Sequence, residues 1–98
     1  MELSLGTESA RLVDPEDMTG FAVVVEGATK PGAEALAAGV IVGLGNHAWV
    51  RTDALRWLAG PAATPAWEDP FAAMLDFARS RGWVDDELGA VRGHVERR

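Results

Sequence analysis

The stretch GVIVGLGNHA, residues 39–48, decides between two classes of fold. Residues 43–48 match G-x-G-x-x-A, the minimal pattern of a turn that binds a dinucleotide between a parallel strand and a helix. That interpretation requires a helix to begin within the hexapeptide, but Trp49 and Val50 come next and favour a strand. It also requires a second parallel strand about twenty residues later, where two prolines are unsuited to a central strand.

We therefore predict that the stretch forms a tight β-hairpin, with Gly45 and Asn46 as its two turn residues. Two β-rich runs, VIVGL and HAWVR, flank this dipeptide. The expected register sets three pairs of residues opposite one another: Leu44 with His47, Val42 with Trp49, and Val40 with Arg51. Since side chains alternate along a strand, His47 and Trp49 share one face of the sheet. We expect no nucleotide at this turn and no cofactor elsewhere in the chain.

The composition is that of one globular domain, 1–98. A chain of 98 residues supports one domain rather than two, and 48% hydrophobic with 24% charged residues is ordinary for a folded protein. Cysteine is absent, which excludes disulfides and thiolate chemistry and fits a reducing compartment. The first residues lack the apolar run of a signal peptide, so we expect a soluble cytoplasmic protein. Abundant residue types with GC-rich codons suggest a bacterial source.

The net charge of −6 argues against two kinds of partner. A protein that binds nucleic acid needs a basic surface to neutralise phosphates, and anionic membranes attract the same kind of surface. One local basic cluster lies near the C-terminus, where we expect it to be solvated: Arg92, His94, Arg97 and Arg98. We therefore expect neither nucleic acid nor a membrane as a partner.

Strands dominate the first part of the chain. Three are predicted before the hairpin, at residues 2–5, 10–13 and 21–26. A turn containing adjacent Pro and Gly follows at 29–32. Residues 33–38, AEALAA, suit a helix by propensity, but the short connection between two β-runs favours a strand. We expect one long strand that ends at Leu44, with a helix at 33–38 as the open alternative.

Two amphipathic helices are predicted in the second part. The first covers 54–59, with Thr52 as its N-cap and Gly60 at its end. Its buried face contains Ala54, Leu55 and Leu58. The second helix is predicted to open at Asp69 and Pro70, a capping residue followed by Pro in the first turn.

The second helix has a regular apolar face and a recognisable end. Apolar residues recur at the helical spacing i, i+3, i+4 and i+7: Phe71, Met74, Leu75 and Ala78. Gly82 is the expected left-handed cap, and Trp83 folds back as its hydrophobic contact.

A final strand is predicted at residues 90–96. Its two faces alternate, with Val91, Gly93 and Val95 on one and Arg92, His94 and Glu96 on the other. The order is strands, two helices and a closing strand. This order predicts an α+β fold: a mostly antiparallel sheet with the helices packed on one face.

His47 and His94 are the only candidates for catalysis, and they are weak ones. If their strands are neighbours, the two side chains converge, and a carboxylate would complete a two-His-one-carboxylate metal site. The nearest carboxylates in this scheme are Asp85, Asp86 and Glu96. The spacing matches no H-x-H or H-E-x-x-H motif. We therefore predict no metal site and assign no catalytic residue.

The aromatic residues carry the strongest functional signal, because the chain has four tryptophans and no tyrosine. Trp57 and Phe77 lie on the flanks of the two predicted helices. These flanks either pack against each other inside the fold or form an apolar patch for a partner, since Trp is enriched at interface hot spots. Both explanations stay open.

Two functions follow from these aromatic residues. The sequence favours a non-enzymatic domain that works by protein association, as a homodimer or as an accessory subunit of a complex. The alternative is a small-molecule-binding protein or enzyme, and a domain that senses a metabolite is a variant of it. Its pocket would lie between the sheet and the helices and be lined by four residues: Trp49, Trp57, Phe77 and His47.

Overall fold

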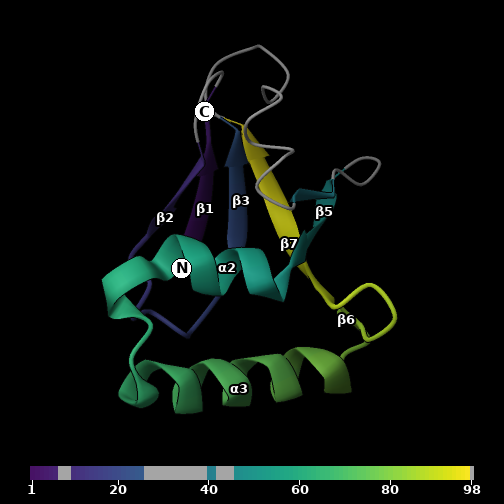
Figure 1. Cartoon of the computed structure of the whole chain (residues 1–98). Helices are drawn as coiled ribbons and strands as arrows, with labels where there is room; N and C mark the ends of the chain where they lie inside the picture. The colour runs from purple at the N-terminus through teal and green to yellow at the C-terminus, as the bar shows by residue number, and fades with distance from the viewer. Residues whose placement is uncertain (7–9, 26–39, 42–45, 98) are drawn as a thin grey trace.

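The computed structural model describes residues 1–6, 10–25, 40–41 and 46–97, which form an α+β fold (Figure 1). Five strands precede the helices: β1 (Glu2–Leu5), β2 (Ala10–Val13), β3 (Ala22–Val25), β4 (Val40–Ile41) and β5 (His47–Arg51). The remaining elements are helix α2 (Thr52–Ala59), the 3-10 helix η1 (Gly60–Ala62), helix α3 (Pro65–Ser80), and strands β6 (Val84–Asp85) and β7 (Ala90–Arg97). The predicted α+β class is confirmed. No helix in the described ranges has both the length and the apolar character needed to cross a membrane.

The sheet is mixed, so the prediction of a mostly antiparallel sheet is wrong. Its strand order is β2-β1-β3-β7-β5-β4, with β6 also pairing with β7. The pairs β1–β3 and β3–β7 are parallel, whereas the others are antiparallel. The cause is long-range: β3 lies on the far side of β1 from β2, and β7 enters between β3 and β5. Local alternation predicts that a segment is a strand, but it does not predict the neighbour of that strand.

The connection between β2 and β3 passes across the start of β1, because these two strands lie on opposite sides of it. There the Met1 ammonium donates hydrogen bonds to the carbonyl oxygens of Asp17 and Gly20, at 2.9 and 3.1 Å. On the other side, the indole Nε1 of Trp67 in α3 donates to the carbonyl oxygen of Pro15 at 2.7 Å. The connection is therefore held between the sheet and α3.

One core unites the sheet with both helices. Alternate residues of the central strands are buried in it: Leu3, Leu5, Val23, Val25, Ala48, Val50 and Val91. The helices add Leu55 and Ala59 from α2, and Trp67, Phe71 and Ala78 from α3. Figure 1 shows α2 lying across the strands, with α3 farther from them. Leu55, Phe71 and Ala78 were predicted on the buried helix faces, whereas the burial of Ala59 and Trp67 was not predicted.

The start of α2 differs from the prediction. The helix begins at Thr52 itself, directly after β5, and Arg51 occupies the N-cap without a side-chain hydrogen bond. The amide and the hydroxyl of Thr52 both donate to the carbonyl oxygen of Gly89, at 2.9 and 3.2 Å. Thr52 is therefore the first helical residue rather than the N-cap. Its hydroxyl links the helix to the turn before β7.

Helix α3 begins one turn earlier than predicted, at Pro65 rather than at Asp69 and Pro70. Pro65 occupies the first turn, where a missing amide proton costs nothing. The extra turn includes Trp67, which is buried and stacks on Phe71 with ring centroids 4.5 Å apart. The helix continues through Pro70, although a proline in this position removes one backbone hydrogen bond.

The end of α3 is as predicted. Gly82 has a left-handed φ of 77°, and the Trp83 amide donates to the carbonyl oxygen of Ala78 at 2.9 Å. The Gly82 amide donates to the carbonyl oxygen of Arg79 at 3.0 Å, and the two bonds together form a Schellman motif. This motif turns Trp83 back towards the helix.

The β4–β5 pair is shifted by one residue from the predicted register. Val40 lies opposite Val50 rather than Arg51, and Ile41 lies opposite Trp49. A shift of one residue exchanges the two faces of a strand relative to its partner. The predicted turn residue Gly45 and the ambiguous segment 33–38 lie outside the described residues.

The segment after the G-x-G-x-x-A pattern is a strand, as predicted. Asn46 lies in a turn, and β5 begins immediately after it at His47. A dinucleotide-binding turn leads into a helix at this point. The chain here continues along the sheet instead.

Gly93 on β7 occupies a position that leaves no room for a side chain. A Cβ at this position would lie 2.8 and 3.0 Å from two ring carbons of Phe21, and 3.1 Å from a methyl carbon of Val23. We predict that Gly93→Ala lowers the free energy of unfolding by about 1–3 kcal/mol, the usual effect of overpacking. Denaturant unfolding followed by circular dichroism measures this difference.

Gly20→Ala is the matched control, because nothing lies within 4 Å of a Cβ at Gly20 and its φ is not left-handed. This variant should stay within roughly 0.5 kcal/mol of the wild type. In a Phe21→Ala background the effect of Gly93→Ala should shrink, since the ring is the nearest obstacle. An equal effect in both backgrounds would contradict the role given to the ring.

Candidate functional site

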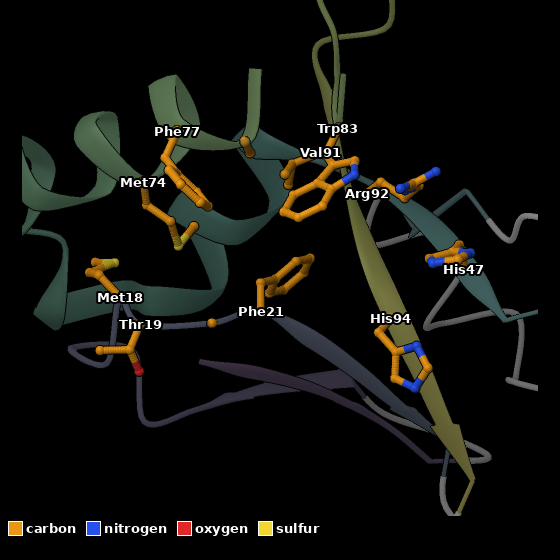
Figure 2. Close-up of a pocket in the computed structure, with 12 residues that line it drawn as sticks. Met18, Thr19, Phe21, His47, Met74, Phe77, Trp83, Val91, Arg92 and His94 are labelled. Atoms are coloured by element: carbon orange, nitrogen blue, oxygen red, sulfur yellow. The ribbon is translucent and has the colours of Figure 1, made fainter. Parts of the chain in front are cut away.

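Strand β7 has a gap in its pairing on the side of β3. On this side β6 pairs with residues 90–91, and β3 pairs with residues 94–97. Between them, the amide of Arg92 donates to the carbonyl oxygen of Trp83 at 2.8 Å, and Phe21 covers Gly93. A pocket of about 250 Å³ lies at this gap (Figure 2).

One part of the pocket, here called the apolar end, is formed by five side chains from three segments of the chain: Met18, Phe21, Met74, Phe77 and Trp83. Met74 and Phe77 come from successive turns of α3, and the rings of Phe77 and Trp83 meet edge to face at 6.3 Å. Figure 2 shows these side chains gathered between α3 and the start of β3. Phe77 is 56% exposed, so this end of the pocket is open to solvent.

The other part, here called the basic end, contains His47, Arg92 and His94. His47 and His94 lie directly opposite each other in the β5–β7 register, and their ring centroids are 6.0 Å apart with the planes at 75°. Arg92 shares a face of β7 with His94, and its guanidinium carbon lies 5.8 Å from the centre of the Trp83 ring. The two histidines were expected to converge only if their strands are neighbours, and β5 and β7 are neighbours in the sheet.

Two of the three carboxylates suggested as metal partners for the histidines, Asp85 and Asp86, form other contacts. The Asp85 carboxylate accepts hydrogen bonds from the amides of Glu87 and Leu88, at 3.0 and 3.1 Å. Asp86 pairs with Arg79. Within the part of the chain that the structure describes, no three His, Cys, Asp or Glu side chains are grouped to hold a metal ion.

Only part of the predicted pocket lining is found in this pocket. Phe77 and His47 line it, whereas Trp49 and Trp57 do not. Trp57 is 75% exposed on α2, and Trp49 is half-buried on β5. The two predicted flanking aromatics therefore differ, because Phe77 belongs to the pocket and Trp57 points into solvent.

The contribution of the connection between β2 and β3 was not predicted from the sequence. This segment supplies Met18 and Thr19, which lie outside every predicted element, and Phe21, which was predicted as the start of a strand but not as a pocket residue. Arg92 was not predicted as a lining residue either, because the basic cluster near the C-terminus was expected to be solvated. A usable signal existed for Trp83, since the Schellman motif already predicted that it folds back towards α3.

No family model matches the chain, and neither a curated protein nor a solved structure matches it. The geometry of the site is therefore the basis for assigning a function.

The edge of the pocket at Thr19 is held by an acidic residue. The pKa of Asp17 is held below its ordinary value, chiefly because its carboxylate accepts a hydrogen bond from the Thr19 hydroxyl. The Thr19 amide donates to the same oxygen at 3.0 Å, and the Met1 ammonium adds attraction. Asp17 thereby fixes the turn from which Met18 and Phe21 extend.

We predict that Thr19→Val raises the pKa of Asp17 towards the ordinary value, because the strongest donor to its carboxylate is lost. Titration of the carboxyl ¹³C resonance by NMR measures this change. A depressed folded-state pKa adds stability above the ordinary value of 3.8, and this contribution is lost as the pH falls through the folded-state pKa. The variant should therefore lose less stability than the wild type on acidification below that value.

Thr19→Ser keeps the hydroxyl and serves as the matched control, so the pKa of Asp17 should stay low in this variant. If the Thr19→Val protein keeps the wild-type pKa, the hydroxyl is not its main cause.

Proposed function

We propose that this chain is a non-enzymatic binding protein for a small apolar molecule, which it holds in the pocket between α3 and β7. The observation that carries the proposal is the convergence of the apolar end, in which five side chains from α3, the β2–β3 connection and the turn after α3 surround one space. Ligand pockets are typically lined by apolar and aromatic side chains, with a few polar groups that orient the ligand.

The volume of the pocket and the chemistry of its lining limit the class of ligand that fits. A volume of about 250 Å³ lies just below the usual range for drug-sized ligands and suits a molecule of one or two rings. Met18 and Met74 offer thioethers that adapt to a ring edge, while Phe77 and Trp83 offer aromatic contacts. The polar side chains among the described lining residues are two imidazoles, one guanidinium and one hydroxyl, few enough to orient a ligand within an apolar site.

Methionine methyl NMR tests this proposal directly, because Met18 and Met74 line the pocket and Met1 lies in the core. We predict that titration with one- and two-ring aromatic compounds shifts the methyl signals of Met18 and Met74 in a saturable way. The signal of Met1 should stay unchanged. Phe77→Ala should weaken binding about tenfold or more, since it removes an aromatic wall.

Trp57→Ala provides the matched control, because it removes an aromatic side chain from a helix without touching the pocket. Binding should be unchanged in this variant. If no aromatic compound shifts Met18 and Met74 at millimolar concentration, the proposed function is wrong.

A second function, protein association, is supported by the position of Trp57. Its side chain is 75% exposed, and the neighbouring Asp53 forms ion pairs with Arg51 and Arg56, at 3.8 and 3.6 Å. An exposed tryptophan beside charged groups is typical of a hot spot with a polar rim. The partner is a second copy of the chain or another protein, as the sequence suggested.

For the homodimer, we predict concentration-dependent association at micromolar protein in analytical ultracentrifugation. Trp57→Ala should shift the distribution to monomer without changing the melting temperature by more than a few degrees, because the ring contributes little to the core. Leu88→Ala is the control, since Leu88 is also exposed, at 51%, but lies in the turn between β6 and β7. If the wild-type protein is monomeric at all concentrations, the homodimer hypothesis is wrong, and association at Trp57 would require a different protein.

A further inference from the structure

The ligand class can be narrowed further, on the condition that the proposed binding function holds. We infer that the molecule held in the pocket carries a carboxylate, and that Arg92 binds this group while His47 and His94 lie beside it. The apolar end then takes the ring or acyl body of the molecule. The ligand is an aromatic or apolar monocarboxylic acid.

The charge distribution supports this inference first. The protein has a net charge of −6, yet the described residues that line the pocket include Arg92 and two histidines and no acidic side chain. A basic site within an acidic protein attracts a small anion locally, while the rest of the surface repels polyanions.

The second observation that supports a carboxylate ligand is that the Arg92 guanidinium has no ion-pair partner among the described residues. Some arginines are neutralised by carboxylates: Arg56 lies 3.1 Å from Glu68, and Arg79 lies 2.8 Å from Asp76. Arg11, Arg81 and Arg97 form no ion pair within the described residues, but Arg92 is the arginine among the lining residues of the pocket. Arg92 forms no such ion pair with any residue in the described ranges, and its guanidinium lies over the Trp83 ring. A guanidinium without a carboxylate partner keeps its N–H groups available, and their planar fork matches a carboxylate.

The arrangement of the histidines supports it third. Strand alternation places Arg92 and His94 on one face of β7, and the register places His47 opposite His94. An imidazole offers at least one N–H donor in either protonation state, so both rings are able to add hydrogen bonds to an anion. The same arrangement is unfavourable for a metal cation, because Arg92 adds a positive charge next to the two imidazoles.

The position of Trp83 joins the two ends of the pocket. Its ring meets Phe77 edge to face at 6.3 Å and lies under the Arg92 guanidinium at 5.8 Å. A ligand ring that contacts Phe77 and Trp83 therefore places a carboxylate on a short spacer near Arg92. Figure 2 shows this sequence of side chains from α3 to the basic end.

The test compares two ligands of the same shape, 1-naphthylacetate and 1-naphthylacetamide, by calorimetry and by the methyl signals of Met18 and Met74. The carboxylate should bind the wild type at least about tenfold more tightly than the amide, because charge-assisted hydrogen bonds are about twice as strong as neutral ones. Its affinity should fall as salt is raised, whereas that of the amide should not.

Arg92→Gln should lower the affinity for the carboxylate roughly ten- to a hundredfold, the range expected for a hydrogen bond to a charged group, and leave the affinity for the amide unchanged. Arg81→Gln is the matched control, since Arg81 is also a cation over an aromatic ring of this region, 5.3 Å from Phe77, but does not line the pocket. An equal loss in both variants would assign the effect to general charge and overturn the role of Arg92.

The two proposals fail in different ways. If the amide and the carboxylate shift Met18 and Met74 with equal affinity, the pocket binds apolar molecules and the carboxylate inference is overturned. If neither compound shifts these signals, the proposed function fails and the inference fails with it. Should Arg92→Gln not fold, Arg92→Lys keeps the charge without the fork, and it should still lose affinity for the carboxylate while the amide binds as before.

Discussion

The pairing of β7 with strands on both of its edges is the constraint on which the rest of the structure depends. Within the described residues, β2-β1-β3 on one side and β5-β4 on the other are joined only through β7. Two short partners, β6 and β3, share one edge of β7 without meeting each other. Phe21 and Trp83 approach this interval, so the pocket exists because the sheet is interrupted there.

Features that depend on local periodicity were well predicted from the sequence. The burial of Phe71 and Ala78 in α3, the left-handed Gly82 and the alternating faces of β7 all follow from contacts within a few residues. The parallel pairs were not predicted, because they depend on which strand β3 and β7 meet after a long excursion of the chain. The register of β4 and β5 differs by one residue from the predicted one, although this pair is local in the chain. Hairpin register depends on the length and type of the turn, and the predicted two-residue turn does not produce the observed pairing.

The candidate site was predictable only where its residues belong to regular elements. Phe77 and His47 were expected near a pocket because a helix flank and a strand face placed them there, and both line it. Trp57 and Trp49 were expected there on the same grounds, from a helix flank and a strand face, but neither residue lines the pocket. Met18 lies outside every predicted element, and Phe21 was predicted only as the start of a strand. Their segment is held in place by long-range hydrogen bonds from Met1 and Trp67, which sequence periodicity does not reveal.

The central place of β7 also affects how the chain folds as it is synthesised. Residues 90–97 leave the ribosome after every other described element, yet β3 and β5 have no sheet partner on their inner edges until this strand arrives. The earlier strands therefore emerge with unpaired backbone groups and wait for a contact of large sequence separation, a situation that slows folding. During that interval the exposed edges are open to pairing between nascent chains, so aggregation competes with folding until β7 is inserted.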